Sequence, residues 1–251
     1  MMILKLENIS YGYKAKTVIN SVNLEIHSGD FIAMIGPNGG GKSTIIKLIM
    51  GLLKPWSGKL SYGVRENGEA VNIGYLPQYH EFDKRFPISV NDVVLSGLAS
   101  VKKGRRNYSR LDKSRAIELL VRMGISELSN ESIGELSGGQ MQRAFLGRAM
   151  ISQPDLLILD EPITYVDNKF EHEMYHLLQE INNNTAILLV SHDIGQISSF
   201  VKTIACVNHS LHYHPSNKIS KDILESYNCP IELITHGKIP HRVLHNHTAH
   251  D

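Results

Sequence analysis

The segment most informative about this chain is Gly36-Pro37-Asn38-Gly39-Gly40-Gly41-Lys42-Ser43. It fits the pattern G-x-x-x-x-G-K-[ST], in which glycines let backbone N–H groups turn toward the oxygens of a phosphate. The apolar run Phe31–Ile35 precedes it and predicts a strand buried on both faces. Helical spacing follows from Thr44 to Leu53. A strand, a glycine loop and a helix in this order predict a phosphate-binding loop at the positive end of a helix.

Apolar strands alternate with helices along the rest of the chain, which predicts an α/β fold with a parallel sheet covered on both sides. Further strands are expected at Ala70–Leu76, Leu156–Leu159, Ile187–Val190 and Ile204–Val207, and helices at Met141–Ser152 and around Phe170–Ile181. The N-terminal part differs, since Ile3–Ile9 and Val22–Ile26 alternate apolar and polar residues at period two and predict half-buried strands.

Two acidic residues, Asp160 and Glu161, follow the predicted strand Leu156–Leu159. The carboxyl end of a parallel strand is where such sheets bind ligands. We therefore expect Asp160 to orient Mg²⁺ opposite the Ser43 hydroxyl and Glu161 to polarise an attacking water as general base. The alternative is a helix N-cap in the turn after the strand.

A second candidate anion site is Leu136-Ser137-Gly138-Gly139-Gln140, directly before a predicted helix. A serine, two glycines and a helix N-terminus can cap a phosphate. Taken alone, the same residues also fit a simple N-capped turn.

Together these motifs resemble the ATP-binding cassette (ABC) family over roughly Met1–Val207. The segments 36–44, 156–160 and 136–140 are similar to its Walker A, Walker B and signature motifs. The resemblance implies catalytic roles for Glu161, His192, Gln78 and Lys42, and magnesium contacts from Ser43, Gln78 and Asp160. It implies ATP contacts from Tyr13 (with Tyr11 as the alternative for adenine stacking), Gly36, Pro37, Asn38, Gly39, Gly40, Gly41, Lys42, Ser43, Thr44, Ser137, Gly138, Gly139, Gln140 and Asp167. The chain departs from the family at Ile163, where threonine is usual, and at Tyr165-Val166, where Ala-Leu is usual.

The resemblance also implies an architecture. We expect a P-loop NTPase (RecA-like) core with a mainly parallel sheet, an N-terminal antiparallel β subdomain and a helical insert at about 85–145. This ABC ATPase domain would span 1–208, with a His-rich extension at 209–251. Two copies would form a head-to-tail homodimer in which Lys42 of one subunit and Ser137 of the other hold the same γ-phosphate.

Finer similarity points to the ATPase subunits of bacterial zinc and manganese importers. It rests on Val190–Gly195, Ala205–Asn208, and Cys229–Ile234 with His236-Gly237. It implies an integral-membrane permease, a periplasmic or extracellular metal-binding protein, and a peripheral location at the cytoplasmic face of the membrane. The permease would contact the surface at Tyr79–Leu95, including His80, Phe82, Phe86 and Val90, although these apolar residues also fit packing inside the helical insert.

Histidines are concentrated at the C-terminal end, since eight of the 13 lie at 209–250. His212 and His214 would share one face of a strand, and His245, His247 and His250 lie near Asp251. Imidazoles and carboxylates suit zinc, so one hypothesis is that zinc on this extension lowers ATPase activity. The alternative is adventitious metal binding by a His-rich tail.

Composition argues against one class of partner. Lys+Arg is 26 and Asp+Glu is 25, giving a net charge of +1, so we expect no nucleic-acid partner. No apolar run approaches the roughly 20 residues of a membrane-spanning helix, and no signal-peptide pattern is present.

The alternative function is that of a soluble ABC ATPase serving iron–sulfur assembly, nucleic acid or ribosomes. A single phosphate loop and the lack of sustained heptads argue against the nucleic-acid and ribosome variants.

Overall fold

The computed structural model describes residues 1–78, 86–99, 107–162, 168–191, 197–216, 233–235 and 240–242. The chain divides into two compact units. We call Met1–Ile3, Ile26–Gly29 and Tyr62–Leu188 the helical unit, and Leu4–Glu25, Asp30–Ser61 and Leu189–Asp251 the phosphate-loop unit. Within the described ranges, no helix combines the length and the hydropathy that crossing a membrane requires.

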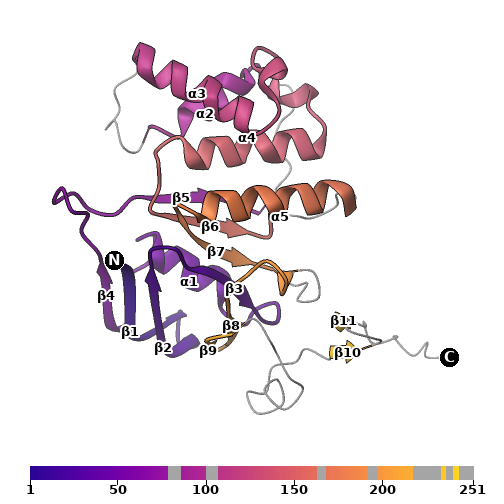
Figure 1. Cartoon of the computed structure of the whole chain (residues 1–251). Helices are drawn as coiled ribbons and strands as arrows, with labels where there is room; N and C mark the ends of the chain where they lie inside the picture. Colours follow the sequence, from indigo (N-terminus) through magenta and orange to yellow (C-terminus); the bar gives the residue numbers. More distant parts are fainter. Residues whose placement is uncertain are drawn as a thin grey trace. The chain divides into compact units, whose positions relative to one another are not determined.

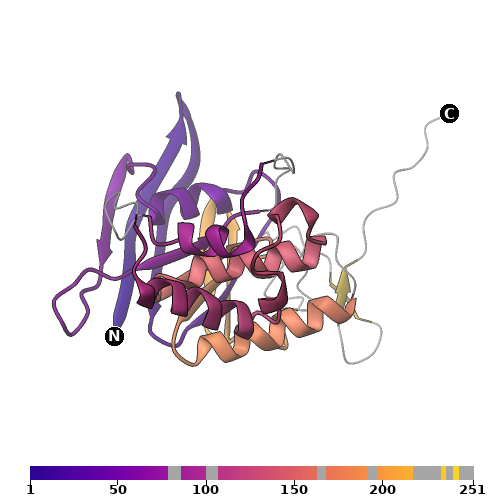
Figure 2. The ribbon, with the colours of Figure 1, turned by 90° about the horizontal axis from the view of Figure 1, so that it is seen from above.

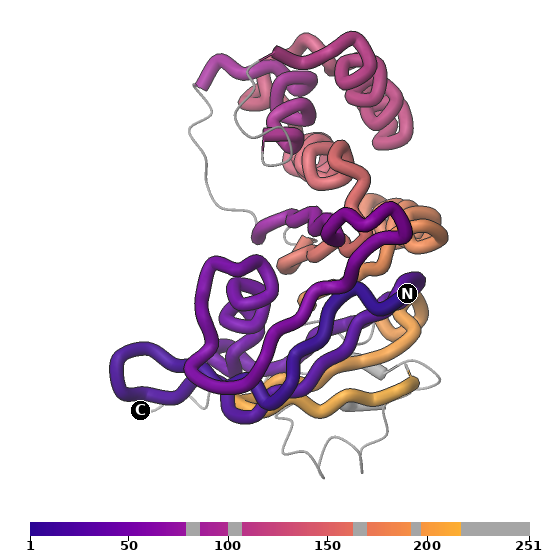
Figure 3. Tube along the Cα trace, turned by 90° about the vertical axis from the view of Figure 1, so that its left-hand side faces the viewer, coloured from indigo at the N-terminus to yellow at the C-terminus, as the bar shows by residue number. Residues whose placement is uncertain are grey.

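The N-terminal strands form an antiparallel sheet of their own. Its members are β1 (Met2–Tyr13), β2 (Lys16–His27) and β4 (Ser57–Tyr62), in the order β2-β1-β4 (Figure 3). The period-two pattern of the sequence corresponds to alternating burial, since Leu4 and Leu6 are buried while Lys5 is half-buried. One face of this sheet therefore contributes to the core.

The larger sheet is mixed and mostly parallel, as the sequence predicts. Its strands are β3 (Phe31–Ile35), β5 (Ile73–Leu76), β6 (Leu156–Asp160), β7 (Ala186–Val190), β8 (Thr203–Asn208) and β9 (Ser210–His214), in the hydrogen-bonded order β5-β6-β7-β3-β8-β9. β3 is parallel to β8, with Ile32 opposite Thr203, and β5 is parallel to β6, with Ile73 opposite Leu156. β9 turns back antiparallel to β8, so residues 210–214, just after the expected domain boundary at 208, belong to this sheet.

Three helices of the helical unit pack against one another (Figure 2). They are α2 (Val90–Ser96), α3 (Arg110–Arg122) and α4 (Gly138–Met150). Val94, Ala116 and Leu146 are fully buried on these three helices, one on each. The unit also holds the short 3₁₀ helices η1 (Ser126–Leu128) and η2 (Ile133–Glu135), and α5 (Asn168–Asn182) (Figure 1).

Some boundaries differ from those predicted. α1 spans Lys42–Ile49 and ends before Leu53, because Gly51 has a φ of 70° and stops the helix. β5 begins at Ile73 rather than Ala70, since Ala70 forms an isolated bridge with Val64. Neither β4 nor the antiparallel pair β10 (Leu233–Thr235) and β11 (Pro240–Arg242) was predicted from the sequence.

Candidate functional site

The phosphate loop, Gly36–Ser43, connects β3 to α1 inside the phosphate-loop unit. Its backbone requires glycine at two positions. Gly36 has a φ of 150° and Gly41 a φ of 110°, conformations that other residues rarely adopt. A Cβ on Gly36 would also collide with the Val207 carbonyl oxygen, and one on Gly41 with the Ile19 side chain. The loop is therefore closely packed against β8 and β2.

Lys42 is buried at the base of this loop, with 6% of its surface exposed. Its Nζ donates hydrogen bonds to the carbonyl oxygens of Gly36 (2.8 Å) and Pro37 (3.0 Å). The N-cap of α1 is Gly41, which has no side chain to satisfy the first N–H groups of the helix. An ammonium group and a helix N-terminus without a side-chain cap form an arrangement suited to a phosphate.

Aromatic residues gather where β1 ends in the same unit. The ring centroids of Tyr11 and Tyr13 lie 5.3 Å apart in an edge-to-face arrangement, and the ring centroids of Tyr11 and Trp56 lie 5.7 Å apart. Tyr13 is 45% exposed, so part of its side chain is accessible to a ligand. Sequence reasoning did not include Trp56 in this cluster, because it comes from the loop before β4.

The two carboxylates at the end of β6 have different partners in the helical unit. Glu161 Oε2 accepts a hydrogen bond from Gln78 Nε2 at 2.7 Å. Asp160 is 8% exposed, and its Oδ2 accepts a hydrogen bond from the Tyr75 hydroxyl at 3.4 Å. Gln78 and Glu161, predicted from separate motifs, are thus brought together.

Tyr75 is a residue of this site that sequence reasoning missed. Burial, together with the charge and hydrogen bond of Asp160, raises the pKa of Tyr75 from 10.0 to about 12. The phenol therefore stays protonated and donates to the carboxylate. The available signal was its position three residues before Gln78, on a strand that runs parallel to β6.

Ser137 and Gln140 cap helix α4 reciprocally. Ser137 Oγ accepts from the Gln140 N–H (3.3 Å), and Gln140 Oε1 accepts from the Ser137 N–H (2.9 Å). A Cβ on Gly139 would lie 2.8 Å from the Phe170 ring of α5, whereas a Cβ on Gly138 would meet nothing within 4 Å. The N-capped turn is therefore present, and its Gly138 side is open.

Arg143 joins this capped helix to its surroundings and was also missed by sequence reasoning. Its guanidinium lies 5.2 Å from the centre of the Phe170 ring and donates to Glu173 (2.7 Å) and to the Met123 carbonyl (2.9 Å). These contacts fix the first turns of α4 relative to α5 and to the end of α3.

Two predicted nucleotide contacts, Asp167 and His192, lie outside the described residues, as do His80 and Phe82. Phe86 is described and is 59% exposed. It lines a cavity of about 170 Å³ in the helical unit, together with Ile88, Val93, Ser96, Ile133, Phe145 and Arg148.

The histidines of β9 form no metal centre that the structure shows. His212 and His214 alternate with Leu211 and Tyr213 on the strand, as expected, and His212 Nε2 lies 3.1 Å from Ser210 Oγ. Burial and the charge of His212 lower the pKa of His214. Among the described residues, no group of three or more potential ligands could hold a metal ion. His245, His247 and His250 are outside those residues.

Comparison with known proteins agrees with this geometry. Residues 19–164 match the ABC transporter family. The chain is 34% identical over 248 residues to the "Probable metal transport system ATP-binding protein" of Thermotoga maritima, covering 98% of each. It is 36% identical over 210 residues to the high-affinity zinc uptake system ATP-binding protein ZnuC of Bacillus subtilis, covering 81% of this chain and 90% of that one. A solved nucleotide-free ATP-binding cassette of an ABC transporter superposes with a TM-score of 0.76 at 23% identity, covering 92% and 96% of the two chains. With its phosphate loop and capped α4 helix, this chain belongs to the ABC transporter family.

Proposed function

We propose that this chain hydrolyses ATP to energise the movement of a divalent metal ion, zinc or manganese, through a separate membrane permease. The observation that carries the proposal is the hydrogen bond between Gln78 and Glu161. It joins the proposed general base to the residue directly before the segment, 79–95, that we expect to face the permease. The cargo is supported by the relatives named for metal and zinc transport. These names do not favour a soluble ATPase without a transport partner.

Within the nucleotide site, Lys42 neutralises the β- and γ-phosphates and Tyr13 stacks on adenine. Glu161 is the general base, a role worth roughly 10²–10⁴ in rate. The remaining phosphate contacts come from the backbone N–H groups of the phosphate loop and Thr44. On the family resemblance alone, His192 contacts the γ-phosphate and Asp167 is a further ATP contact.

The family resemblance assigns magnesium to three side chains whose donor atoms suit it. The donors are the Ser43 hydroxyl, the Asp160 carboxylate and the Gln78 amide oxygen, and hard oxygen ligands are those that Mg²⁺ prefers. Gln78 donates to Glu161 through its nitrogen, which leaves the amide oxygen as the atom for the ion. When bound, the ion supplies positive charge at the β- and γ-phosphates.

A homodimer completes the site. One phosphate loop leaves a side of the γ-phosphate without donors, and a serine-capped helix from a second copy supplies them. Ser137 to Gln140 form this cap, and the open side of Gly138 leaves room for a phosphate there. Hydrolysis removes the charge shared between subunits, so ATP biases an equilibrium between closed and open dimers.

The permease is proposed to dock at the cavity of the helical unit. Five of its described lining residues are apolar, namely Phe86, Ile88, Val93, Ile133 and Phe145. Phe86 is mostly exposed, as expected of a side chain that packs against a partner. A metal-binding protein outside the membrane would deliver the ion to the permease.

The proposal is tested with Glu161→Gln and a matched control, Glu66→Gln, at an exposed turn of the helical unit. ATP hydrolysis by purified protein and uptake of zinc, manganese and iron by a complemented deletion strain are measured. We expect Glu161→Gln to bind ATP, lose about 100-fold or more of its hydrolysis and fail to restore uptake, whereas the control behaves as wild type. Full hydrolysis by Glu161→Gln would remove Glu161 from the base role. Uptake that persists without hydrolysis would refute the coupling.

A further inference from the structure

His209 occupies the turn between β8 and β9, beyond the region 19–164 that matches the family. Its φ is 59°, a left-handed conformation that is uncommon for residues with a side chain, although histidine adopts it more often than most. A strained position of this kind persists where surrounding contacts impose it. At His209 those contacts involve the phosphate loop.

The backbone of His209 joins two segments of the phosphate-loop unit. Its N–H donates to the Gly40 carbonyl oxygen at 2.9 Å, and its own carbonyl accepts from the Asn20 N–H at 2.7 Å. Gly40 belongs to the phosphate loop, and Asn20 belongs to β2. The turn is therefore hydrogen-bonded on one side to the loop and on the other to a strand of the N-terminal sheet.

The imidazole of His209 makes a third contact, which is also with β2. His209 Nδ1 lies 2.9 Å from the Val18 carbonyl oxygen. Because a carbonyl oxygen only accepts, Nδ1 carries the hydrogen and donates it. The side chain thus holds the turn to β2 independently of the two backbone bonds.

The phosphate loop packs closely against both β8 and β2. A Cβ on Gly40 would lie 2.8 Å from the Val207 carbonyl oxygen, and one on Gly41 would collide with the Ile19 side chain. A shift of the β8–β9 turn relative to β2 would therefore displace the loop carbonyl at Gly40 and the N–H groups that follow it.

We propose that His209 is a positioning residue for the phosphate loop: its imidazole joins β2 to the turn that holds Gly40, and so keeps the loop N–H groups arranged for a nucleotide. This inference rests on the proposed binding of ATP at the loop. It assigns a function to a residue outside the nucleotide motifs, and His209 itself contacts no phosphate.

The test separates the contribution of the imidazole hydrogen bond from that of the two backbone hydrogen bonds. His209→Gly retains the left-handed turn and removes the imidazole bond, whereas His209→Asn tolerates the same conformation and keeps an N–H donor. The control is Gln153→Gly, which changes another left-handed, exposed residue (φ 51°) in the helical unit. ATP dissociation constants are measured by equilibrium binding, together with KM, kcat and melting temperature.

We expect His209→Gly to weaken ATP binding and raise KM by about three- to tenfold, the effect of one hydrogen bond, with kcat within about twofold of wild type. His209→Asn should recover most of this loss, and Gln153→Gly should bind as wild type. Unchanged binding by His209→Gly, equal loss in the glycine and asparagine variants, or a fall in kcat at constant KM would overturn the inference. If wild type itself neither binds nor hydrolyses ATP, the proposed function fails instead.

Discussion

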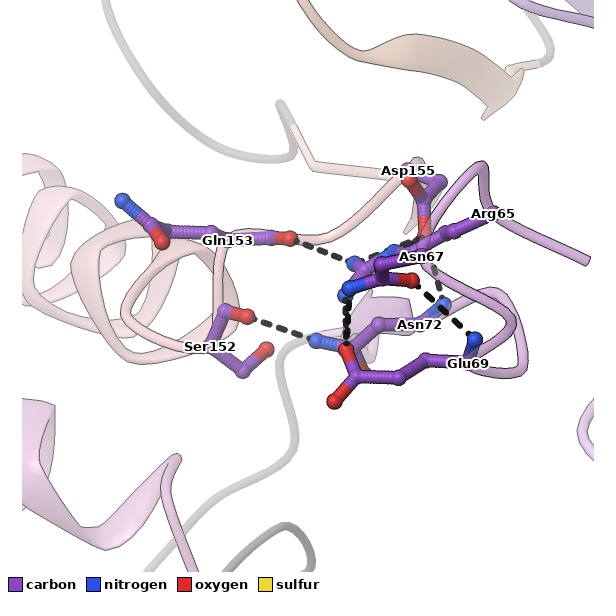
Figure 4. Close-up of polar contacts among 7 residues, drawn as sticks. All are labelled: Arg65, Asn67, Glu69, Asn72, Ser152, Gln153 and Asp155. Atoms are coloured by element: carbon purple, nitrogen blue, oxygen red, sulfur yellow. Dashed lines mark hydrogen bonds and ion pairs between the residues drawn. The ribbon is translucent and has the colours of Figure 1, made fainter.

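Replacing Asp155 with alanine should lower the free energy of unfolding by about 2–3 kcal/mol. Asp155 directly precedes β6, and its Oδ2 accepts hydrogen bonds from the Asn72 N–H (2.7 Å) and from Arg65 Nε (2.8 Å) (Figure 4). The same oxygen forms an ion pair with Arg65 Nη2 at 2.8 Å. The Arg65 and Asp155 side chains are only 27% and 19% exposed, so water replaces these bonds poorly. The amide bond accounts for about 1 kcal/mol and the charge-assisted pair for about 1–2 kcal/mol.

A double-mutant cycle followed by urea unfolding measures the interaction energy between Arg65 and Asp155. Arg65→Ala, Asp155→Ala and the double variant should show a coupling of about 1 kcal/mol, because the residues are in direct contact. Glu69→Ala is the control, since Glu69 is 68% exposed and lies 3.7 Å from the same arginine. Exposed pairs contribute little, so this variant should cost less than about 0.5 kcal/mol. A coupling near zero, or an equal cost for Glu69 and Asp155, would refute the argument.

Three further predictions follow from the site. The pKa of Tyr75 is raised to about 12 in the folded chain, so the unfolded chain ionises first as the pH rises above 10.0. The stability contribution of this phenol is therefore present below pH 10 and lost toward pH 12, and the difference in urea unfolding between wild type and Tyr75→Phe should shrink over that range. The single tryptophan, Trp56, contacts Tyr11, which contacts Tyr13, so ATP should change its fluorescence in wild type and not in Tyr13→Ala; the same emission change in both would exclude Tyr13 as the adenine contact. A chain truncated after Ser216 retains β9 with His212 and His214 but lacks the histidines at 236–250. If those histidines sense metal, its ATPase activity should resist zinc concentrations that inhibit the full chain; equal inhibition would exclude them as the sensor.

The parts of the fold that the sequence predicts are those where one physical requirement acts along a short segment. Phe31–Ile35 forms β3 with the predicted bounds, because five consecutive apolar residues fit a strand buried on both faces. The phosphate loop was identified because backbone approach to an anion demands glycine at fixed spacing. The N-cap at Ser137 follows the same logic, since its partner Gln140 is three residues away.

Elements that depend on distant pairing are not predictable in this way. The residues of β4, Ser57–Tyr62, are mostly exposed and carry no period-two apolar pattern, so only their pairing with β1 makes them a strand. The role of His209 has the same origin, because two of its bonds use backbone atoms that every residue has. The one local signal was a histidine in a short turn, where its left-handed preference could have been considered.

The paired acids show why spacing alone leaves roles unassigned. In a regular strand, Asp160 and Glu161 would point to opposite faces of the sheet. Instead β6 ends at Asp160, and Glu161 takes a left-handed conformation with a φ of 49°. This turn lets both carboxylates meet partners from the β5 segment, Tyr75 for Asp160 and Gln78 for Glu161. A phenol that stays protonated and an amide that offers both a donor and an acceptor suit different tasks, one orienting an ion ligand and the other a base. The different partners of the two adjacent acids thus come from a strained backbone residue, and they agree with the separate roles proposed for Asp160 and Glu161.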